Sequence, residues 1–322
     1  MIFTLIFCML TLQYVPQQFP QRFYIERRLP IFEYIGSETP VEYLAPQPVI
    51  ARDIQGSWVL IDTWLGQMWL YLDYQPSTDE MDYMLSRFGN NLSVFFKNIE
   101  TGFTYMYNPN RVYFSASVTK ASYALYLFYR AERGEINLGD YITYTSADFN
   151  GGSGIIKYRY PMGTEFTIRE LIRLNLSYSD NIATNMLRRI HGIEGYREFL
   201  QSIGANPNHV GYNIFNSRLT VTDAGIFALE IFNYVESPES EFGTEFIEHL
   251  LNNQYPFIVS CYPVASKTGW TRPLAWHDMA IVYAESPYIL VILSARNGWS
   301  ARDYRDFEEI SMMFQRFNNM WF

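Results

Sequence analysis

Ser117 and Lys120 stand three residues apart in SASVTKAS, immediately before the apolar and aromatic run YALYLFY. If this segment forms a helix, the spacing places the hydroxyl and the ammonium on one face, one turn apart. A serine hydroxyl becomes a nucleophile when a neighbouring amine removes its proton. The pair therefore indicates nucleophilic catalysis, and a solvated or helix-capping pair is the alternative for a Ser-x-x-Lys pattern on its own.

Two further polar motifs follow in elements that suit a catalytic site. Residues 179–181 (Ser-Asp-Asn) lie in a predicted loop between two helices, and residues 267–269 (Lys-Thr-Gly) directly precede a predicted aromatic strand. Each tripeptide is commonplace alone, because Asp-Asn favours a turn and Gly commonly marks the end of an element. The three motifs in this order form a much more specific pattern than any one of them.

This motif set resembles that of the penicillin-recognising serine hydrolases, which include the class A β-lactamases and the penicillin-binding D-Ala-D-Ala peptidases. The resemblance covers residues 80–322 and includes TIRELIRLNLSYSDNIATNMLRR, which is similar to the helix-loop-helix around the second motif of class A enzymes. It implies that family's fold, a serine hydrolase activity, a β-lactam or peptidoglycan stem-peptide substrate, and no metal or other cofactor.

The resemblance also implies the catalytic roles. Ser117 is expected to be the acylated nucleophile, Lys120 its base, and Ser179 the residue that passes the proton to the leaving nitrogen. Lys267 would be a second cation that, together with burial, lowers the pKa of Lys120. A position at a helix N-terminus would also stabilise the negative charge that develops at Ser117.

The substrate-binding positions of the family are carried over in the same way. The oxyanion hole is expected to consist of the backbone N–H groups of Ser117 and Trp270. The residues expected at the substrate are Asn181 at its amide, Lys267 and Thr268 at its carboxylate, and Gly269, Trp270 and Arg272 beside them. Arg272 would supplement carboxylate binding, with a surface arginine as the alternative.

One part of the class A pattern is missing from the sequence. Class A enzymes clear the acyl-enzyme with a glutamate in a loop between the second and third motifs, whereas SIGANPNHVGYNIFNSRLTVTD contains no Glu. Its single carboxylate, Asp223, is predicted to cap a helix, and Glu170 and Glu198 are predicted on helices outside that loop. We therefore expect slow deacylation, because general-base assistance is typically worth about 10²–10⁴-fold.

Three functional hypotheses follow. The first is a serine hydrolase of cell-wall stem peptides, or of a related amide or ester, which β-lactams acylate. The second is an efficient β-lactamase with a different base, such as a water held near Tyr212 or Asn213. The third is a binding or sensing module whose Ser117 is acylated and stays acylated. A wholly non-catalytic wall-binding protein would make the three aligned motifs a coincidence.

Composition excludes several other classes of protein. The net charge of −9, with no stretch dense in Lys and Arg, argues against a nucleic-acid partner and against electrostatic binding to anionic lipid. The two cysteines, Cys8 and Cys261, do not predict a disulfide framework. Four histidines lack the spacing of metal ligands: His191, His209, His249 and His277.

The N-terminal part of the chain reads as two segments. Residues 1–20 fit the hydrophobic region of an export signal or anchor, with a buried strand as the alternative, and predict an extracytoplasmic protein that is secreted or associated with the membrane or cell wall. Residues 21–75 contain short alternating runs typical of a small all-β domain.

Within that second segment, GSWVLIDTWLGQMWLYL resembles the closing strands of bacterial Src-homology-3-like domains. The resemblance implies a cell-wall polymer as a partner of this domain. Trp58, Trp64 and Trp69 would then contact the polymer or, alternatively, belong to the domain core.

From residue 80 onward the order of elements is strands, helices, strands and a final helix, which predicts an α+β fold with one antiparallel sheet covered by helices. LSVFFKNIE with FTYMYNP, and HDMAIVYA with YILVILSA, predict hairpins. A helix is expected from near Ser117 to Gly134, and another is expected after the capping pair Thr167 and Glu170. Further helices are expected over NIATNMLRRIHG, over TVTDAGIFALEIFNYV with Thr222 or Asp223 as its cap, and over ARDYRDFEEISMMFQRF.

Overall fold

The computed structural model describes residues 20–25, 28–74, 77–211, 217–272, 275–296 and 301–322. The chain divides into two units, a first that ends at residue 76 and a second that begins at Ser77. Residues 1–19, which hold most of the predicted export segment, lie outside the described residues. No helix in the described part is long and apolar enough to cross a membrane.

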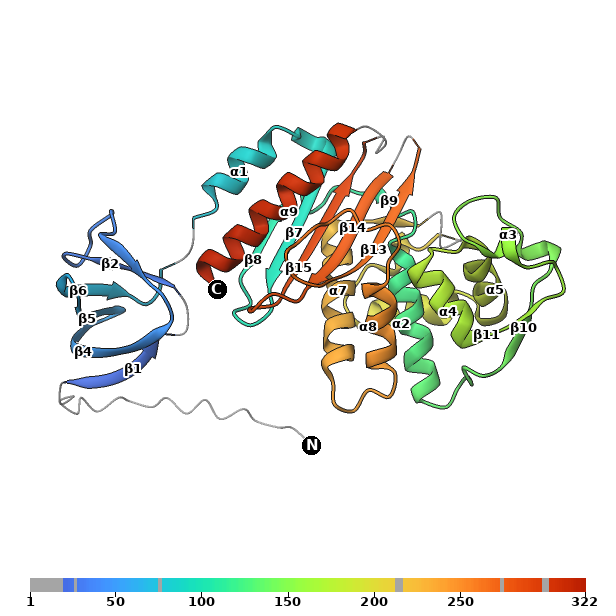
Figure 1. Ribbon diagram of the computed structural model, residues 1–322, viewed down its shortest axis with the longest axis horizontal. Coiled ribbons are helices and arrows are strands. Elements are labelled where there is room, and N and C mark those ends of the chain that lie inside the picture. The colour runs from blue at the N-terminus through green and yellow to red at the C-terminus, as the bar shows by residue number, and fades with distance from the viewer. Residues whose placement is uncertain (1–19, 26–27, 75–76, 212–216, 273–274, 297–300) are drawn as a thin grey trace. The chain divides into compact units, whose positions relative to one another are not determined.

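The first unit is a six-stranded antiparallel sheet in the order β1-β4-β5-β6-β2-β3 (Figure 1). Its strands are β1 (Gln21–Ile25), β2 (Leu29–Phe32), β3 (Glu42–Leu44), β4 (Gln47–Gln55), β5 (Trp58–Thr63) and β6 (Gly66–Tyr71). Alternate residues such as Val59 and Ile61 are buried and form a small core that belongs to this unit. Trp64, in the β5–β6 turn, is 67% exposed. The Src-homology-3-like assignment stays a prediction.

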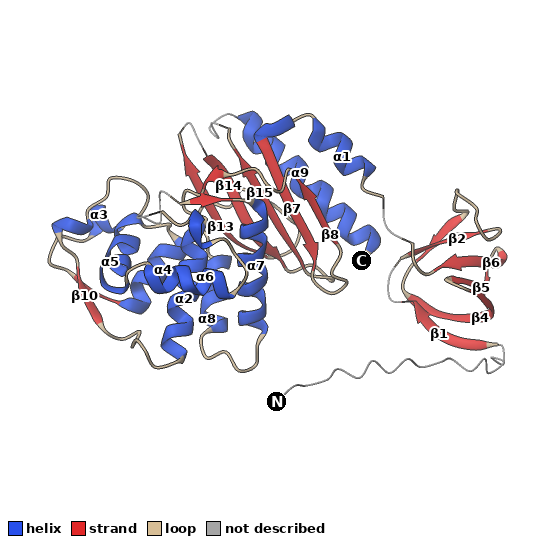
Figure 2. Cartoon of the chain, turned by 180° about the vertical axis from the view of Figure 1, so that it is seen from behind, coloured by secondary structure: helices blue, strands red, loops and turns tan. Residues whose placement is uncertain are grey.

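The second unit is built on a five-stranded antiparallel sheet in the order β13-β14-β15-β7-β8. Its strands are β7 (Leu92–Asn98), β8 (Thr104–Tyr107), β13 (Val264–Thr271), β14 (Ala275–Val282) and β15 (Tyr288–Ser294). Every residue of β14 and β15 is buried, because helices cover both faces of the sheet (Figures 1 and 2). Both predicted hairpins, β7–β8 and β14–β15, are confirmed.

Two neighbouring residues of β7 show how the sheet is covered on both faces. Phe95 packs against Gly225, where a Cβ atom would lie 2.7 Å from its ring, and Phe96 stacks on Phe314 at 5.2 Å between ring centroids. Successive strand residues point to opposite faces, so one face meets α7 and the other meets α9 (Figure 1). The helices that frame the sheet are α1 (Asp79–Ser86), α2 (Thr119–Glu132), α7 (Val221–Glu236), α8 (Gly243–Leu251) and α9 (Ala301–Trp321).

The remaining helices form a helical part beside the sheet (Figure 2). They are α3 (Ile156–Arg159), α4 (Ile168–Ser177), α5 (Asn181–His191) and α6 (Glu194–Ser202). The second unit also has two two-stranded sheets. In one, β10 (Tyr141–Thr143) pairs with β11 (Glu165–Thr167), and in the other, β9 (Tyr113–Phe114) pairs with β12 (Arg218–Leu219). The predicted capping box of α4 is confirmed, since Thr167 Oγ1 accepts from the Glu170 N–H at 3.1 Å and the Glu170 carboxylate accepts from the Thr167 N–H at 2.8 Å. The predicted α+β fold is thus observed.

Helix α7 begins at a different cap from the one predicted. Its N-cap is Thr220 rather than Thr222 or Asp223, and Thr220 Oγ1 accepts from the Asp223 N–H at 3.1 Å. Asp223 is the third helical residue and returns the bond through its carboxylate. The reason is tertiary, because β12 pairs with β9 up to Leu219 and the chain turns into the helix directly afterwards.

His277 of β14 ties the sheet to the strand that precedes Ser117. Its Nε2 donates to the Phe114 carbonyl oxygen at 2.8 Å, and its Nδ1 accepts from the Ser294 N–H at 3.0 Å. One nitrogen must donate and the other must accept, so the imidazole is neutral with its proton on Nε2. The ring is fully buried, and this burial lowers the pKa of His277 to about 4.

This histidine predicts a loss of stability in acid. The pKa of His277 in the folded protein lies below its value of about 6.5 in the unfolded chain. The contribution of His277 to the free energy of unfolding is therefore complete above about pH 6.5 and is lost as the pH drops towards 4. In urea unfolding, we expect the wild type to lose about 2 kcal/mol more than His277→Gln between about pH 7 and about pH 4.5. An equal loss of unfolding free energy in the wild type and in His277→Gln would contradict the assignment of His277 as a buried neutral imidazole.

Candidate active site

Ser117 follows a segment that is held from two sides. The Ser115 N–H donates to the Ser217 carbonyl oxygen at 2.9 Å, beside the pairing of β9 with β12. On the other side, a Cβ atom at Gly269 would lie 2.8 Å from the Ser117 nitrogen and 2.9 Å from the Ser115 oxygen, so this close approach requires glycine. Ala116 adopts a φ of 46°, which costs a non-glycine residue about 1–2 kcal/mol. These contacts fix Ser117 immediately before α2.

Lys120 lies in the first turn of α2 and is fully buried. Its Nζ donates to the Ser179 carbonyl oxygen at 2.6 Å, to Ser179 Oγ at 3.3 Å and to Asn181 Oδ1 at 2.7 Å. Burial holds the pKa of Lys120 well below its ordinary value, and the nearby Lys267 cation lowers it further, while Asp180 opposes the shift. The amine therefore loses its proton more readily than a solvated lysine, as a general base must.

Asp180 fixes the loop that carries the second motif. One carboxylate oxygen accepts from two N–H groups in the first turn of α5, and the other accepts from the Ile155 and Ile156 N–H groups at 2.6 and 2.9 Å. A Cβ atom at Gly154 would collide with this carboxyl group. Ser179 holds a φ of 50°, another left-handed non-glycine conformation. Asp180 thus has a positioning role that sequence analysis did not assign.

The third motif lies inside β13 rather than ahead of a strand as predicted. Lys267 is fully buried, and burial lowers its pKa to about 7 although the Asp278 carboxylate opposes the shift. Asp278 faces Thr268 across the β13–β14 pair and accepts from the Phe257 and Ile258 N–H groups at 2.8 and 2.9 Å. Thr268 Oγ1 is buried without a hydrogen-bond partner among the described residues. This hydroxyl can therefore serve a ligand.

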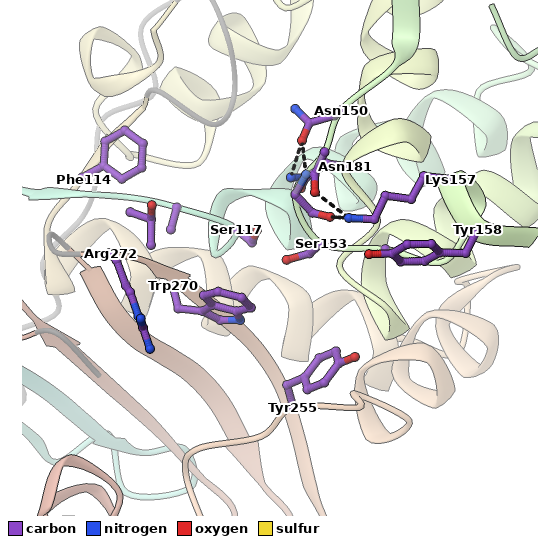
Figure 3. A pocket seen from close by; sticks show the side chains of 15 residues that line it. Phe114, Ser117, Asn150, Ser153, Lys157, Tyr158, Asn181, Tyr255, Trp270 and Arg272 are labelled. Carbon is purple, nitrogen blue, oxygen red and sulfur yellow. Dashed lines mark hydrogen bonds between the residues drawn. The ribbon is translucent and has the colours of Figure 1, made fainter. Parts of the chain in front are cut away.

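A cavity of about 960 Å³ opens over these elements (Figure 3). The predicted site residues in its wall are Ser117, Asn181, Trp270 and Arg272. The other predicted residues are buried and are not among those that line the cavity: Lys120, Ser179, Lys267, Thr268 and Gly269. In the described part of the chain, no group of three or more His, Cys, Asp and Glu side chains could hold a metal ion.

Several wall residues were missed by sequence analysis. Asn150, Lys157 and Tyr158 come from the segment that leads into and through α3, and Tyr255 comes from the connection between α8 and β13 (Figure 3). The glycine cluster in NGGSG was a signal for the first group, because glycines permit close backbone approach. No local pattern marked Tyr255, which reaches the cavity only through the tertiary fold.

Asn150 holds the amide of Asn181 in a fixed orientation. Its Oδ1 accepts from Asn181 Nδ2 at 3.0 Å and from the Gly152 N–H at 2.8 Å, while Asn181 Oδ1 accepts from Lys120. An amide NH₂ group has two hydrogens, so Asn181 retains one donor for a substrate carbonyl. The amide is thereby oriented between the buried amine and the cavity.

Asp223 is the single carboxylate of residues 202–223, the interval between the second and third motifs that contains no Glu, and it is held by several hydrogen bonds. One oxygen of this carboxylate accepts from the Asn206 N–H at 3.0 Å, and the other accepts from Thr220 Oγ1 at 2.8 Å and pairs with His209 Nδ1 at 2.8 Å. The contacts with Asn206 and His209 join the start of α7 to the chain before residue 211, and the contact with Thr220 caps the helix, so Asp223 has a structural role. The alternative base position near residues 212–213 lies outside the described residues.

The second unit matches a known family. The model of Beta-lactamase2, the beta-lactamase enzyme family, matches residues 76–313. The chain belongs to the beta-lactamase enzyme family. The β-lactamase of Bacillus licheniformis is 27% identical over 244 residues, covering 70% of the chain and 78% of that protein. The β-lactamase SME-1 of Serratia marcescens is 30% identical over 122 residues, covering 37% of the chain and 40% of that protein.

Solved structures of low sequence identity share the family's fold. A β-lactamase from Sphaerobacter thermophilus has a TM-score of 0.67 at 18% identity and covers 76% of this chain and 99% of its own. A variant of PBP-A, described as an acyl-enzyme complex with penicillin G, has a TM-score of 0.64 at 20% identity and covers 75% of this chain and 96% of its own. The first unit lies outside the family match, apart from its last residue.

The bond between Asn150 and Asn181 predicts a substrate-dependent defect. In Asn150→Ala, acylation by benzylpenicillin should slow about fivefold to tenfold, because Asn181 loses the partner that orients it. Acylation by 6-aminopenicillanic acid, which lacks the side-chain amide, should change little. Asn137→Ala, which removes an exposed bond to the Gly139 N–H, is the control. Equal slowing with both compounds would exclude the orienting role.

Proposed function

We propose that this chain is a serine hydrolase that forms an acyl-enzyme on Ser117, with β-lactams and D-Ala-D-Ala-type cell-wall peptides as its substrates. The observation that carries the proposal is the buried amine of Lys120, which lies one turn after Ser117 and is hydrogen-bonded to Ser179 and Asn181. The lowered pKa of Lys120 favours the neutral amine that can accept a proton. Membership of the beta-lactamase enzyme family supports the same reaction type.

In the acylation step, Lys120 accepts the Ser117 proton as Oγ attacks the substrate carbonyl carbon. The backbone N–H groups of Ser117 and Trp270 stabilise the oxyanion. The proton then passes through Ser179 to the leaving nitrogen, the C–N bond breaks, and the acyl group remains as an ester on Ser117. The 3.3 Å separation between Lys120 Nζ and Ser179 Oγ supports this proton path.

The carboxylate end of the substrate is bound at β13 in this proposal. Lys267 supplies a buried cation, Thr268 supplies the unpartnered hydroxyl, and Arg272 adds a second positive charge at the cavity wall. A β-lactam and a D-Ala-D-Ala peptide both carry a carboxylate beyond the reacting amide. A buried cation that is shielded from water attracts a carboxylate more strongly than a cation at the protein surface does.

Deacylation is proposed to be slow. A general base that activates water is typically worth about 10²–10⁴-fold, and the interval that should supply it has Asp223 as its single carboxylate. That carboxylate is occupied by Asn206, His209 and Thr220. The structure of a PBP-A variant, described as an acyl-enzyme complex with penicillin G, is a precedent for a penicilloyl ester on this fold.

The proposed substrates imply a location and a role for the first unit. Because peptidoglycan lies outside the cytoplasmic membrane, we propose that the protein is extracytoplasmic, secreted or held at the membrane or wall. The first unit would contact wall polymer, and the exposed indole of Trp64 is a surface on which a sugar ring can stack.

A nitrocefin experiment tests the proposed reaction. We expect a burst of about one equivalent of hydrolysed nitrocefin and then slow turnover, because acylation outpaces deacylation. Mass spectrometry after reaction with labelled penicillin should locate the label on Ser117. Ser117→Ala should show neither burst nor label, whereas Ser153→Ala, which changes another serine of the cavity wall, should retain both.

The other outcomes separate the competing hypotheses. Sustained fast turnover would favour an efficient β-lactamase with another base over the slow hydrolase. Release of D-Ala from a D-Ala-D-Ala peptide would support the peptide substrate, and a label that never leaves Ser117 would indicate a sensor. Turnover that persists in Ser117→Ala would contradict all three hypotheses, because each of them requires acylation of Ser117.

The cation at Lys267 predicts the pH dependence of acylation. Its pKa of about 7 means that the ammonium loses its charge as the pH rises through this value, so acylation by benzylpenicillin should decline there. A penicillin methyl ester has no carboxylate and should show no such decline. Lys267→Arg should keep the charge and move the decline to higher pH. Parallel pH profiles for acid and ester would contradict carboxylate binding by Lys267.

A further inference from the structure

We propose that Lys157 forms a second anion-binding subsite, which takes a carboxylate on the acyl side of the substrate. This inference rests on the function proposed above. Among the described residues, the charged side chains in the cavity wall are Lys157 and Arg272, and the wall holds no carboxylate. The whole chain has 33 acidic residues and 24 Lys and Arg, so this lining is opposite in sign to the protein as a whole. Such a wall attracts anionic ligands.

The two cations lie on different sides of the nucleophile. Arg272 follows β13 at the edge of the sheet, whereas Lys157 belongs to α3 in the helical part, and Ser117 lies between them in Figure 3. If the carboxylate beyond the scissile bond binds at the sheet, then the acyl side of the substrate extends towards α3. A ligand with negative charge at both ends therefore matches the wall better than one with a single charge.

The ammonium of Lys157 is already held in place. Its Nζ donates to the Gly151 carbonyl oxygen at 2.5 Å and to the Gly152 carbonyl oxygen, and lies 4.7 Å from the centre of the Tyr158 ring. An ammonium has three hydrogens, so one donor remains for a ligand. Because the side chain is half-buried and ordered in advance, little conformational entropy is lost when it binds.

The surroundings of Lys157 indicate what accompanies the carboxylate. Tyr158 and Tyr255 are 79% and 51% exposed, and both lie at the cavity wall on the Lys157 side of Ser117 (Figure 3). Exposed aromatic rings at a cavity mouth are suited to an aryl or other flat apolar group. The preferred acyl group therefore combines such a group with a carboxylate. In a peptide substrate, the corresponding feature is a carboxylate farther from the cleaved bond, on the acyl side of the residue that precedes it.

A matched pair of penicillins tests this subsite. Carbenicillin is benzylpenicillin with one added carboxylate on the side-chain carbon, so the ratio of their acylation rate constants isolates that group. We expect Lys157→Met to lower the carbenicillin rate constant about tenfold more than the benzylpenicillin one, and Lys157→Arg to restore the ratio. Added salt should reduce the wild-type ratio.

Lys157 could instead serve only to fasten the loop at Gly151 and Gly152. In that case, Lys157→Met would slow both penicillins equally, and this result would overturn the subsite. An unchanged ratio in a well-folded variant would also overturn it.

Binding measurements separate this subsite from the proposed function. In Ser117→Ala, calorimetry should show that Lys157→Met weakens carbenicillin binding about tenfold and benzylpenicillin binding little. If the wild type were never acylated but this binding difference appeared, the proposed reaction would fail and the subsite would stand. Acylation of the wild type without any binding difference would leave the reaction intact and remove the subsite.

Discussion

The burial of two lysines in one site is the constraint on which the rest of the structure depends. Lys120 and Lys267 are both shielded from water, and an unpaired ammonium in such surroundings is strongly unfavourable. Three oxygen atoms accept from Lys120 Nζ, and the carboxylate of Asp278 partly compensates the charge of Lys267. Burial lowers the pKa of Lys120, and the Lys267 cation lowers it further, which is consistent with the role of base proposed for Lys120.

Holding these groups together requires strained backbone at the same place. Ala116 and Ser179 have positive φ values, and each belongs to a segment that carries one of the sequence motifs. Such conformations cost about 1–3 kcal/mol each and persist only where the surroundings enforce them. The bond from Ser115 to Ser217 and the four N–H groups bound by Asp180 supply that enforcement. The strain therefore lies in the two segments that Lys120 joins through its hydrogen bonds to Ser179.

Local patterns predicted much of this arrangement, and long-range pairing accounts for the rest. The Ser117–Lys120 spacing, the Thr167 capping box and both hairpins depend on neighbours in sequence, so the sequence was sufficient for them. The electrostatic interaction between Lys267 and Asp278 depends on the register of β13 and β14, and the cap of α7 depends on where β12 stops pairing. Residues that reach the cavity from distant connections, such as Tyr255, follow no periodic pattern.

The same charge distribution connects substrate choice with turnover. A carboxylate beside the acyl-enzyme would activate water, but it would also repel a substrate that carries negative charge on its acyl side. The described cavity wall holds cations and no carboxylate, and Asp223 is occupied in joining the start of α7 to the preceding chain. An acid-free wall thus favours capture of anionic substrates at the expense of a base for hydrolysis. The proposed long-lived acyl-enzyme and the proposed preference for carboxylate-bearing acyl groups would then have one physical cause.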